Sequence, residues 1–345
     1  MKSAAEEITP QWLTQTLNEA GFTGVVQKVT WQRIGAGQVG ENARFFLSGK
    51  GDIPATVVGK FPSTDPISKQ TGVQLLNYAR ECWFYRDLDA TVRVKTPTVY
   101  GIEFDDQTHD FVILMEDLAP GFQIDQMAAA NVDQAKLALE QLAGLHGPRW
   151  ADPTLREHPL AQPPPVADDD TPLYCMLQPD FVERYGARLG EAELQAVHDI
   201  GETHKIAKPY DGEVTLIHVD YRLDNMIFGG PRPLTILDWQ SINLGCAFQD
   251  VSYFMGTSLE PDIRKRHEQA LVKFYLDALA KYHITISFEQ AWHLYRRHAQ
   301  AGLNMAVIAS MIVGETDRGN DMFMTMAKRS IAMCHDLETA TLLLT

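Results

Sequence analysis

Cysteines are few in this chain of 345 residues, and long apolar runs are absent. Its four cysteines, Cys82, Cys175, Cys246 and Cys334, lie far apart and form no CxxC pair. Neither a disulfide framework nor a zinc site is therefore indicated. No apolar stretch reaches the length of about 18 residues that a membrane span needs, and the first residues, MKSAAEEITPQWL, lack the order of a signal peptide. We therefore expect a cytoplasmic protein without a membrane partner.

Basic residues are also scarce, with 30 Lys and Arg against 45 Asp and Glu, for a formal net charge of −15. This deficit argues against nonspecific binding to nucleic acid or to an anionic membrane. It would suit a cationic substrate, although an acidic surface that keeps an enzyme in solution is the simpler explanation. Hydrophobic residues make up 45% of the chain, so a sizeable core can form in two domains or in one bilobed fold.

Strand-like runs dominate the first third of the chain, and helical patterns dominate the rest. Apolar periodicity and turn residues predict helices at 9–20 and 72–88 and strands at 25–34, 41–49, 54–62, 96–104 and 110–118. This order indicates an antiparallel sheet with one helix against it. Further on, the patterns predict helices at 131–150, 174–187 and 191–207, short strands within 214–239, and mostly helix from 247. A Pro- and Asp-rich loop is expected at 152–172.

The first motif is glycine-rich and follows a predicted strand. Gly35, Gly37 and Gly40 spell G-x-G-x-x-G. A dinucleotide-binding fold, as in an oxidoreductase, would begin a helix inside this motif. Here the strand-like ENARFFLS follows instead, and strand, glycine loop, strand is the kinase arrangement in which a hairpin covers nucleotide phosphates. An ordinary glycine-rich hairpin stays open as the alternative.

A lysine and a glutamate follow in the order that a kinase requires. Lys60 ends a predicted strand and can point toward phosphates, while Glu81 lies among apolar neighbours in the middle of the next predicted helix. Kinases hold such a lysine with a carboxylate from that helix. A solvated lysine and an exposed helical glutamate remain the plainer interpretation of either residue alone.

The densest cluster of polar residues is IHVDYRLDNMIF, residues 217–228. Asp220, Arg222 and Asn225 have the spacing D-x-R-x-x-N, His218 stands two residues before the aspartate, and Asp238 follows Asn225 by thirteen residues at a strand end. The kinase catalytic pattern has this order and spacing. A charged turn between strands is the alternative, but it does not explain why every position matches.

Phosphoryl transfer explains these residue types. The reaction needs positioning and neutralisation of negative charge more than covalent help. Amide and carboxylate oxygens suit Mg²⁺, which points to Asn225 and Asp238 as metal ligands. Asp220 can orient an acceptor hydroxyl and take its proton, and Arg222 can offset charge at the γ-phosphate. His218 is expected to brace the loop. A nucleoside triphosphate and Mg²⁺ are therefore the expected cofactors.

At this point the chain resembles the aminoglycoside phosphotransferase and choline kinase superfamily of small-molecule kinases, most closely its bacterial ecdysteroid-kinase-like branch. Six stretches carry the resemblance: RECWFYRDL (80–88), VILMEDL (112–118), LAGLHGPRW (142–150), HVDYRLDNMIF (218–228), LTILDWQ (234–240) and GCAFQDVSYF (245–254). The resemblance implies an α+β, protein-kinase-like bilobed fold. Residues 1–118 would form the N-lobe with an antiparallel sheet and a helix, and residues 119–345 would form a mainly helical C-lobe with the catalytic loop and acceptor site.

The resemblance also implies an ATP-dependent kinase of a small hydroxylated molecule. The backbone of the hinge, which includes Met115, Glu116 and Leu118, would meet adenine, and Lys60 would contact phosphate while paired with Glu81. Asp250 would brace the catalytic loop, although a helix N-cap is the alternative for it.

Three departures from the family stand out. Valine occupies position 219, where the family often has glycine, DWQ replaces the DFG of protein kinases, and no APE segment appears. Only eleven residues separate Asp238 from Asp250. This leaves little room for an activation loop and disfavours a protein substrate.

Some residues keep open interpretations. His146 fits a packed or capping histidine better than a ligand, and Asp224 has no obvious duty and could be solvated. Methionines of the C-terminal region could line an adaptable apolar pocket for a bulky alcohol or simply pack in the core: Met305, Met311, Met322, Met324, Met326 and Met333. A nucleotide-binding pseudokinase is the alternative function, but no catalytic residue is lost. The sequence does not separate monomer from homodimer, name the acceptor or choose between ATP and GTP.

Overall fold

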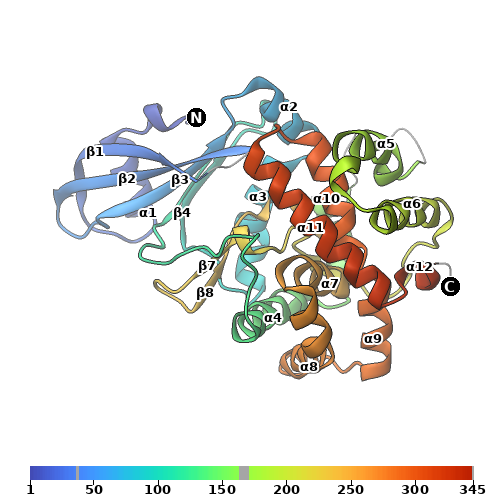
Figure 1. Ribbon diagram of the computed structural model, residues 1–345. Coiled ribbons are helices and arrows are strands. Elements are labelled where there is room, and N and C mark those ends of the chain that lie inside the picture. The colour runs from blue at the N-terminus through green and yellow to red at the C-terminus, as the bar shows by residue number, and fades with distance from the viewer. Residues whose placement is uncertain (36–38, 163–170, 344–345) are drawn as a thin grey trace.

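The computed structural model describes residues 1–35, 39–162 and 171–343. Its smaller lobe is one antiparallel sheet with strand order β1-β2-β3-β5-β4 (Figure 1). The strands are β1 (Val25–Ile34), β2 (Gly40–Lys50), β3 (Thr56–Pro62), β4 (Val99–Phe104) and β5 (Phe111–Glu116). Helix α1 (Pro10–Glu19) packs against β1 and β4. Its start is as predicted, because the Thr9 hydroxyl caps it by accepting from the Trp12 N–H at 3.2 Å.

Strand β5 is buried on both faces and joins the two lobes. Phe111, Ile113 and Met115 belong to the large core shared with the helical lobe. Val112 and Leu114, which point the other way, belong to a smaller core beneath α1. Alternate residues of a strand face opposite sides of its sheet. A strand with two buried faces therefore appears as the continuous apolar run FVILM.

The predicted single helix at 72–88 was wrong. The chain forms α2 (Pro66–Gln74) and α3 (Asn77–Trp83), which continues into a π-helical turn at Phe84–Leu88. Leu76 breaks the helix in a left-handed conformation with φ of 59°. The break lets the Tyr78 side chain fold back toward the sheet, where its hydroxyl donates to the Val39 carbonyl at 2.6 Å.

The larger lobe is mainly helical, as predicted (Figure 1). Its helices are α4 (Val132–His146), α5 (Leu173–Tyr185), α6 (Glu191–Ile206), α7 (Ala247–Ser258), α8 (Pro261–Ala280), α9 (Phe288–Arg297), α10 (Ala301–Ile312), α11 (Asp317–Asp336) and α12 (Thr339–Leu343). Two short antiparallel pairs, β6 (Thr215–Ile217) with β9 (Asn243–Gly245) and β7 (Met226–Phe228) with β8 (Leu234–Ile236), frame the polar cluster. The predicted α+β class, with an antiparallel sheet in one lobe and a mainly helical second lobe, is therefore confirmed.

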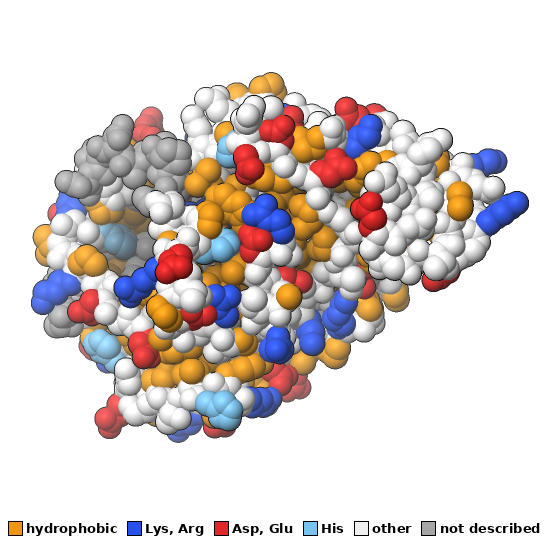
Figure 2. All heavy atoms as spheres, turned by 180° about the vertical axis from the view of Figure 1, so that it is seen from behind, with side chains coloured by type: hydrophobic (Ala, Val, Ile, Leu, Met, Phe, Trp, Pro, Cys, Tyr) orange, Lys and Arg blue, Asp and Glu red, His pale blue; other side chains and the backbone are white. Residues whose placement is uncertain are grey.

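The lobes share packing, so the division at residue 118 stays a prediction. The sheet ends at Glu116, close to that boundary. However, side chains of α3 and β5 lie in the same hydrophobic core as the C-lobe helices. Among the described residues, no helix combines the length and the hydropathy that crossing a bilayer requires. On the face shown in Figure 2, acidic and basic side chains are interspersed with apolar ones.

Candidate active site

A cavity of about 900 Å³ lies between the lobes. Its sheet side is formed by the N-lobe, the hinge and the β7–β8 segment, and its apolar lining there includes Ile34, Val39, Val58, Leu118, Ile227 and Leu237. Its helical side is formed by α5, α10 and α11 and is lined by Leu173, Met305, Ile308, Ala309, Ile312, Val313, Met322, Phe323 and Met326. The polar residues Lys60, Glu81, Asp220, Asn225 and Asp238 line the same cavity.

Lys60 lies between two carboxylates. Its Nζ is 2.6 Å from Glu81 Oε2 and 2.8 Å from Asp238 Oδ1. Burial alone would lower the pKa of Lys60, but Asp238 and Glu81 outweigh it and raise the pKa above its usual value. The lysine therefore stays protonated, and the pairing with Glu81 that the sequence indicated is present.

Helix α3 is fastened to the segment after Asp238. The Trp239 N–H points at Glu81 Oε1 at 3.4 Å, and the Trp239 ring stacks on Phe84 with ring centroids 3.8 Å apart. Arg80, buried in the same helix, donates to the Ile242 carbonyl at 2.6 Å. These contacts hold Glu81 within reach of Lys60, because the helix cannot shift without losing them.

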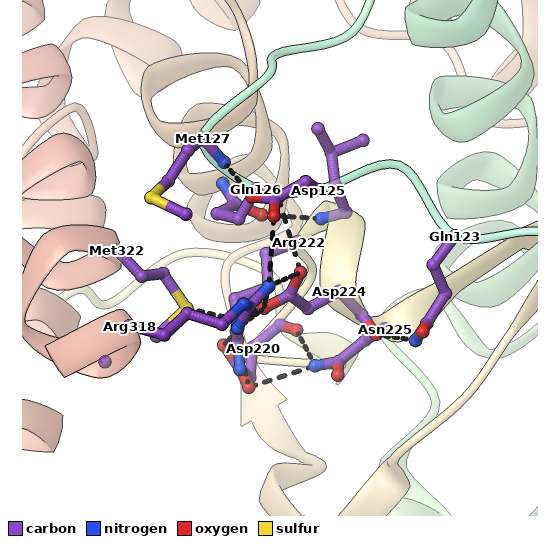
Figure 3. A network of polar contacts seen from close by, with 12 residues as sticks. Gln123, Asp125, Gln126, Met127, Asp220, Arg222, Asp224, Asn225, Arg318 and Met322 are labelled. Atoms are coloured by element: carbon purple, nitrogen blue, oxygen red, sulfur yellow. Dashed lines mark hydrogen bonds and ion pairs between the residues drawn. The ribbon is translucent and has the colours of Figure 1, made fainter. Parts of the chain in front are cut away.

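The Asp220 carboxylate is held by Arg222 and Asn225 of the catalytic loop (Figure 3) and by Tyr253 of α7. Oδ1 accepts from the Tyr253 hydroxyl at 2.7 Å and from Arg222 Nε at 3.0 Å, and Oδ2 accepts from Asn225 Nδ2 at 3.0 Å. Burial alone would raise the pKa of Asp220, but Arg222 and Tyr253 outweigh it and hold the pKa below its usual value. Asp220 is therefore ionised near neutral pH.

Asp250 braces the loop backbone from α7. Its buried carboxylate accepts from the His218 N–H at 2.6 Å and from the Val219 N–H at 2.9 Å. His146 Nε2 lies 3.2 Å from the same carboxylate, and its Nδ1 lies 2.7 Å from the Tyr275 hydroxyl. His146 is thus packed, as predicted, and it also supports Asp250, a role that the sequence did not reveal.

Val219 takes a conformation that suits glycine. Its φ is 73°, in the left-handed region, where a β-branched residue is strained. The two hydrogen bonds to Asp250 hold this turn. His218 itself is buried, and its Nε2 lies 2.9 Å from the Leu237 carbonyl. These contacts make His218 a bracing residue for the loop.

The glycine loop and the hinge also reach the cavity. Gly35, with a φ of 70°, and Gly40 line it, whereas Gly37 lies outside the described residues. A Cβ on Gly40 would approach the Phe61 carbonyl to 3.1 Å, so the hairpin is tight there. Met115, Glu116 and Leu118 line the cavity as well. The Glu116 carboxylate receives the Thr98 N–H at 2.6 Å and pairs with Arg232, so its side chain supports the hinge.

Asn225 and Asp238 fit a divalent cation in their chemistry. The Asn225 amide nitrogen donates to the Asp220 carbonyl at 2.8 Å, which leaves the amide oxygen as the ligand atom. Asp238 uses Oδ1 for Lys60 and retains Oδ2, and its side chain is 28% exposed toward the cavity. Hard oxygen atoms of this kind suit Mg²⁺. In the described part of the chain, no cluster of three or more His, Cys, Asp or Glu has the geometry of a metal site.

Two residues depart from the sequence-based expectations. Asp224, for which the sequence left a solvated position open, is instead only 17% exposed, and it accepts from Arg222 Nη1 at 2.9 Å and from Arg318 Nη2 at 3.2 Å (Figure 3). Arg318, at the start of α11, was missed because it lies 94 residues from Asp224. The six methionines divide: Met305, Met322 and Met326 line the cavity, and the other three lie elsewhere.

Parts of the chain resemble known proteins in sequence. Residues 175–288 match the model of the ecdysteroid kinase-like family. Mouse acyl-CoA dehydrogenase family member 10 is 34% identical over 80 residues, which make up 21% of this chain and 8% of that protein. The chain thus spans less than a tenth of the length of this relative.

Solved structures share the fold over nearly the whole chain. The GDP complex of wild-type aminoglycoside 2′-phosphotransferase-IIIa superposes with a TM-score of 0.51 at 18% identity, covering 88% of this chain and 93% of that one. A protein of Ralstonia eutropha JMP134 assigned to the aminoglycoside phosphotransferases superposes with a TM-score of 0.50 at 15% identity, covering 96% and 97%. At such identities the likeness establishes the fold. It thus confirms the predicted protein-kinase-like fold, and the family match over residues 175–288 agrees with the resemblance to ecdysteroid-kinase-like proteins that the motifs indicated.

Proposed function

We propose that this protein is an ATP- and Mg²⁺-dependent phosphotransferase that moves the γ-phosphate to a hydroxyl group of a small molecule. The observation that carries the proposal is that one cavity collects Lys60 with its two carboxylates and the Asp220–Asn225 pair. These groups come from four separate segments of the chain. A charged surface turn would not bring groups from four segments into one cavity.

Each residue has a role set by its chemistry. Asp220, ionised and fixed by Tyr253, would orient the acceptor hydroxyl and take its proton. Asn225 and Asp238 would hold Mg²⁺, which supplies positive charge beside the phosphates. Lys60 would bind phosphate oxygens, and Arg222 would offset negative charge at the transferred group. The glycine hairpin and the hinge would enclose the nucleotide.

The acceptor proposed here is a bulky apolar alcohol. The helical side of the cavity is lined by aliphatic, methionine and phenylalanine side chains from α5, α10 and α11. An aminoglycoside carries many ammonium and hydroxyl groups, and burial against this wall would leave them without hydrogen-bond partners. Methionine side chains adapt to irregular apolar shapes. The wall therefore favours an apolar body with one hydroxyl directed at Asp220.

Titration calorimetry tests the nucleotide site without knowledge of the acceptor. We expect wild-type protein to bind MgATP with micromolar affinity and Asp238→Ala to weaken this binding by on the order of tenfold or more, because a metal ligand is lost. Omission of Mg²⁺ should reduce the difference between the two proteins. Asp106→Ala, which removes an exposed carboxylate in the turn between β4 and β5, is the matched control.

The calorimetric outcomes separate the alternatives. Equal MgATP affinity in wild type and Asp238→Ala would contradict the metal assignment. Tight MgATP binding without turnover on any alcohol would favour the pseudokinase, which the intact set of catalytic residues argues against. No binding of any nucleoside triphosphate would contradict the proposed function as a whole.

A further inference from the structure

We propose that Asp224 and Arg318 are positioning residues that couple occupancy of the helical side of the cavity to the arrangement of Asp220 and Arg222. The inference rests on the proposed function for its catalytic consequence. The coupling itself concerns an apolar ligand and the catalytic loop, so it can be measured without phosphate transfer. Figure 3 shows the network that carries it.

The first link joins α11 to the catalytic loop. Arg318 lies one residue after the start of α11 and donates from Nη2 to Asp224 Oδ1 at 3.2 Å and from Nη1 to Oδ2 at 3.3 Å. Asp125, from the segment after the hinge, lies 3.6 Å from the same guanidinium. The end of α11 is therefore tied to two segments of the site at once.

The second link joins Asp224 to the catalytic pair. Asp224 Oδ2 accepts from Arg222 Nη1 at 2.9 Å, and Nε of the same Arg222 side chain donates to Asp220. One carboxylate thus holds two guanidinium groups, one from the loop and one from α11. The Arg318 side chain is 50% exposed, and exposed ion pairs contribute little, but Asp224 itself is only 17% exposed. If Asp224 were lost, Arg222 would have only Asp220 as a carboxylate partner.

The third link starts at the cavity wall. Met322, one turn after Arg318 on α11, lines the cavity, and its Sδ lies 3.0 Å from Arg222 Nη1. A ligand that packs against Met322 therefore touches a side chain in direct contact with Arg222. The same helix thus supplies both the apolar wall and the charge that holds Asp224. A shift of α11 would move Arg222 relative to Asp220.

Hydrogen exchange with a simple apolar alcohol tests this coupling. The probe is 1-decanol, and the readout is the exchange rate of backbone amides in residues 218–228 with and without saturating probe. We expect the probe to slow exchange there by roughly fivefold in the wild type. Arg318→Ala and Asp224→Asn should abolish this effect while binding 1-decanol within about threefold of the wild-type affinity, since neither variant changes an apolar residue of the wall.

Two further variants make the test specific. Arg188→Ala removes a different exposed ion pair to α11, between Arg188 and Asp321 at 2.7 Å, which does not touch the catalytic loop. This variant should retain the full slowing of exchange by 1-decanol. Arg318→Lys keeps the positive charge and should restore part of the slowing of exchange that Arg318→Ala loses. Where transfer to 1-decanol is measurable, Arg318→Ala should lower kcat by about tenfold with little change in the KM for the alcohol.

The outcomes against the proposal are equally distinct. The coupling would be overturned if 1-decanol did not slow amide exchange of residues 218–228 in the wild type. It would also be overturned if this slowing survived in Arg318→Ala or disappeared equally in Arg188→Ala. Failure of the proposed function would instead appear as missing MgATP binding, which leaves the 1-decanol result unaffected. The two failures are therefore distinguishable.

Discussion

The two sides of the cavity are built by different means. The polar groups around the sheet side come from compact segments, such as the catalytic loop at 217–228, and each is fixed by hydrogen bonds or ion pairs to named partners. The helical side is lined by apolar residues from α5 and, much later in the sequence, from the consecutive helices α10 and α11. Charges that must stand at fixed positions therefore leave a spaced pattern in the sequence, whereas the apolar wall left only the open possibility that C-terminal methionines line a pocket.

The largest expected effect concerns the chemistry of the polar groups. Asp220→Asn should reduce phosphate transfer by on the order of 10²-fold or more, because an amide cannot take the acceptor proton. The affinity for MgATP should change little, as calorimetry would show, since the assigned metal ligands and Lys60 remain. Full transfer activity in this variant would remove Asp220 from its assigned role.

An intermediate effect should arise on the helical side. Met305→Gln places an amide in the apolar wall. It should lower kcat/KM for an apolar alcohol by about tenfold relative to a polar alcohol, because the amide would be buried against the apolar alcohol without a hydrogen-bond partner. Met311→Gln is the control, since this residue lies on the same helix but lines a different cavity. MgATP affinity should be the same in both variants. An equal loss in the two variants would mean that the wall does not select the acceptor.

The smallest effect concerns strain in the catalytic loop. Val219→Gly removes the strain of a β-branched residue in the left-handed conformation, which is about 1–3 kcal/mol. Glycine also adds about 0.5–1 kcal/mol of backbone entropy cost on folding. The free energy of unfolding should therefore rise by about 1 kcal/mol, as measured by denaturant titration. Val219→Ala keeps a Cβ at the same φ and should give no gain. A Val219→Gly protein less stable than Val219→Ala would mean that side-chain packing outweighs the strain.

The same contrast explains what the sequence predicted. The Lys60–Glu81 pair followed from a strand end and an apolar helix, and the spacing within 218–238 indicated the remaining polar groups. The break at Leu76 could not be predicted, because the apolar periodicity continues through it and a left-handed leucine has no sequence signal.

Local sequence patterns also could not predict the long-range contacts. His146 supports Asp250 from 104 residues away, and Arg318 reaches Asp224 from 94 residues away. Neither pair has a spacing that marks it, since tertiary packing alone brings the partners together. The sequence left open whether the C-terminal methionines line a pocket or pack in the core, and the wall itself became visible only when α5, α10 and α11 were placed around one cavity.

The central claim is tested most directly by following the γ-phosphate of labelled ATP in the presence of Mg²⁺ and a panel of 1-decanol, cholesterol, ethanolamine and kanamycin. We predict a phosphate ester of an apolar alcohol with wild-type protein and on the order of 10²-fold less with Asp220→Asn. Transfer to none of these acceptors, with no release of phosphate to water above the Asp220→Asn level, would contradict the claim that this cavity catalyses phosphoryl transfer.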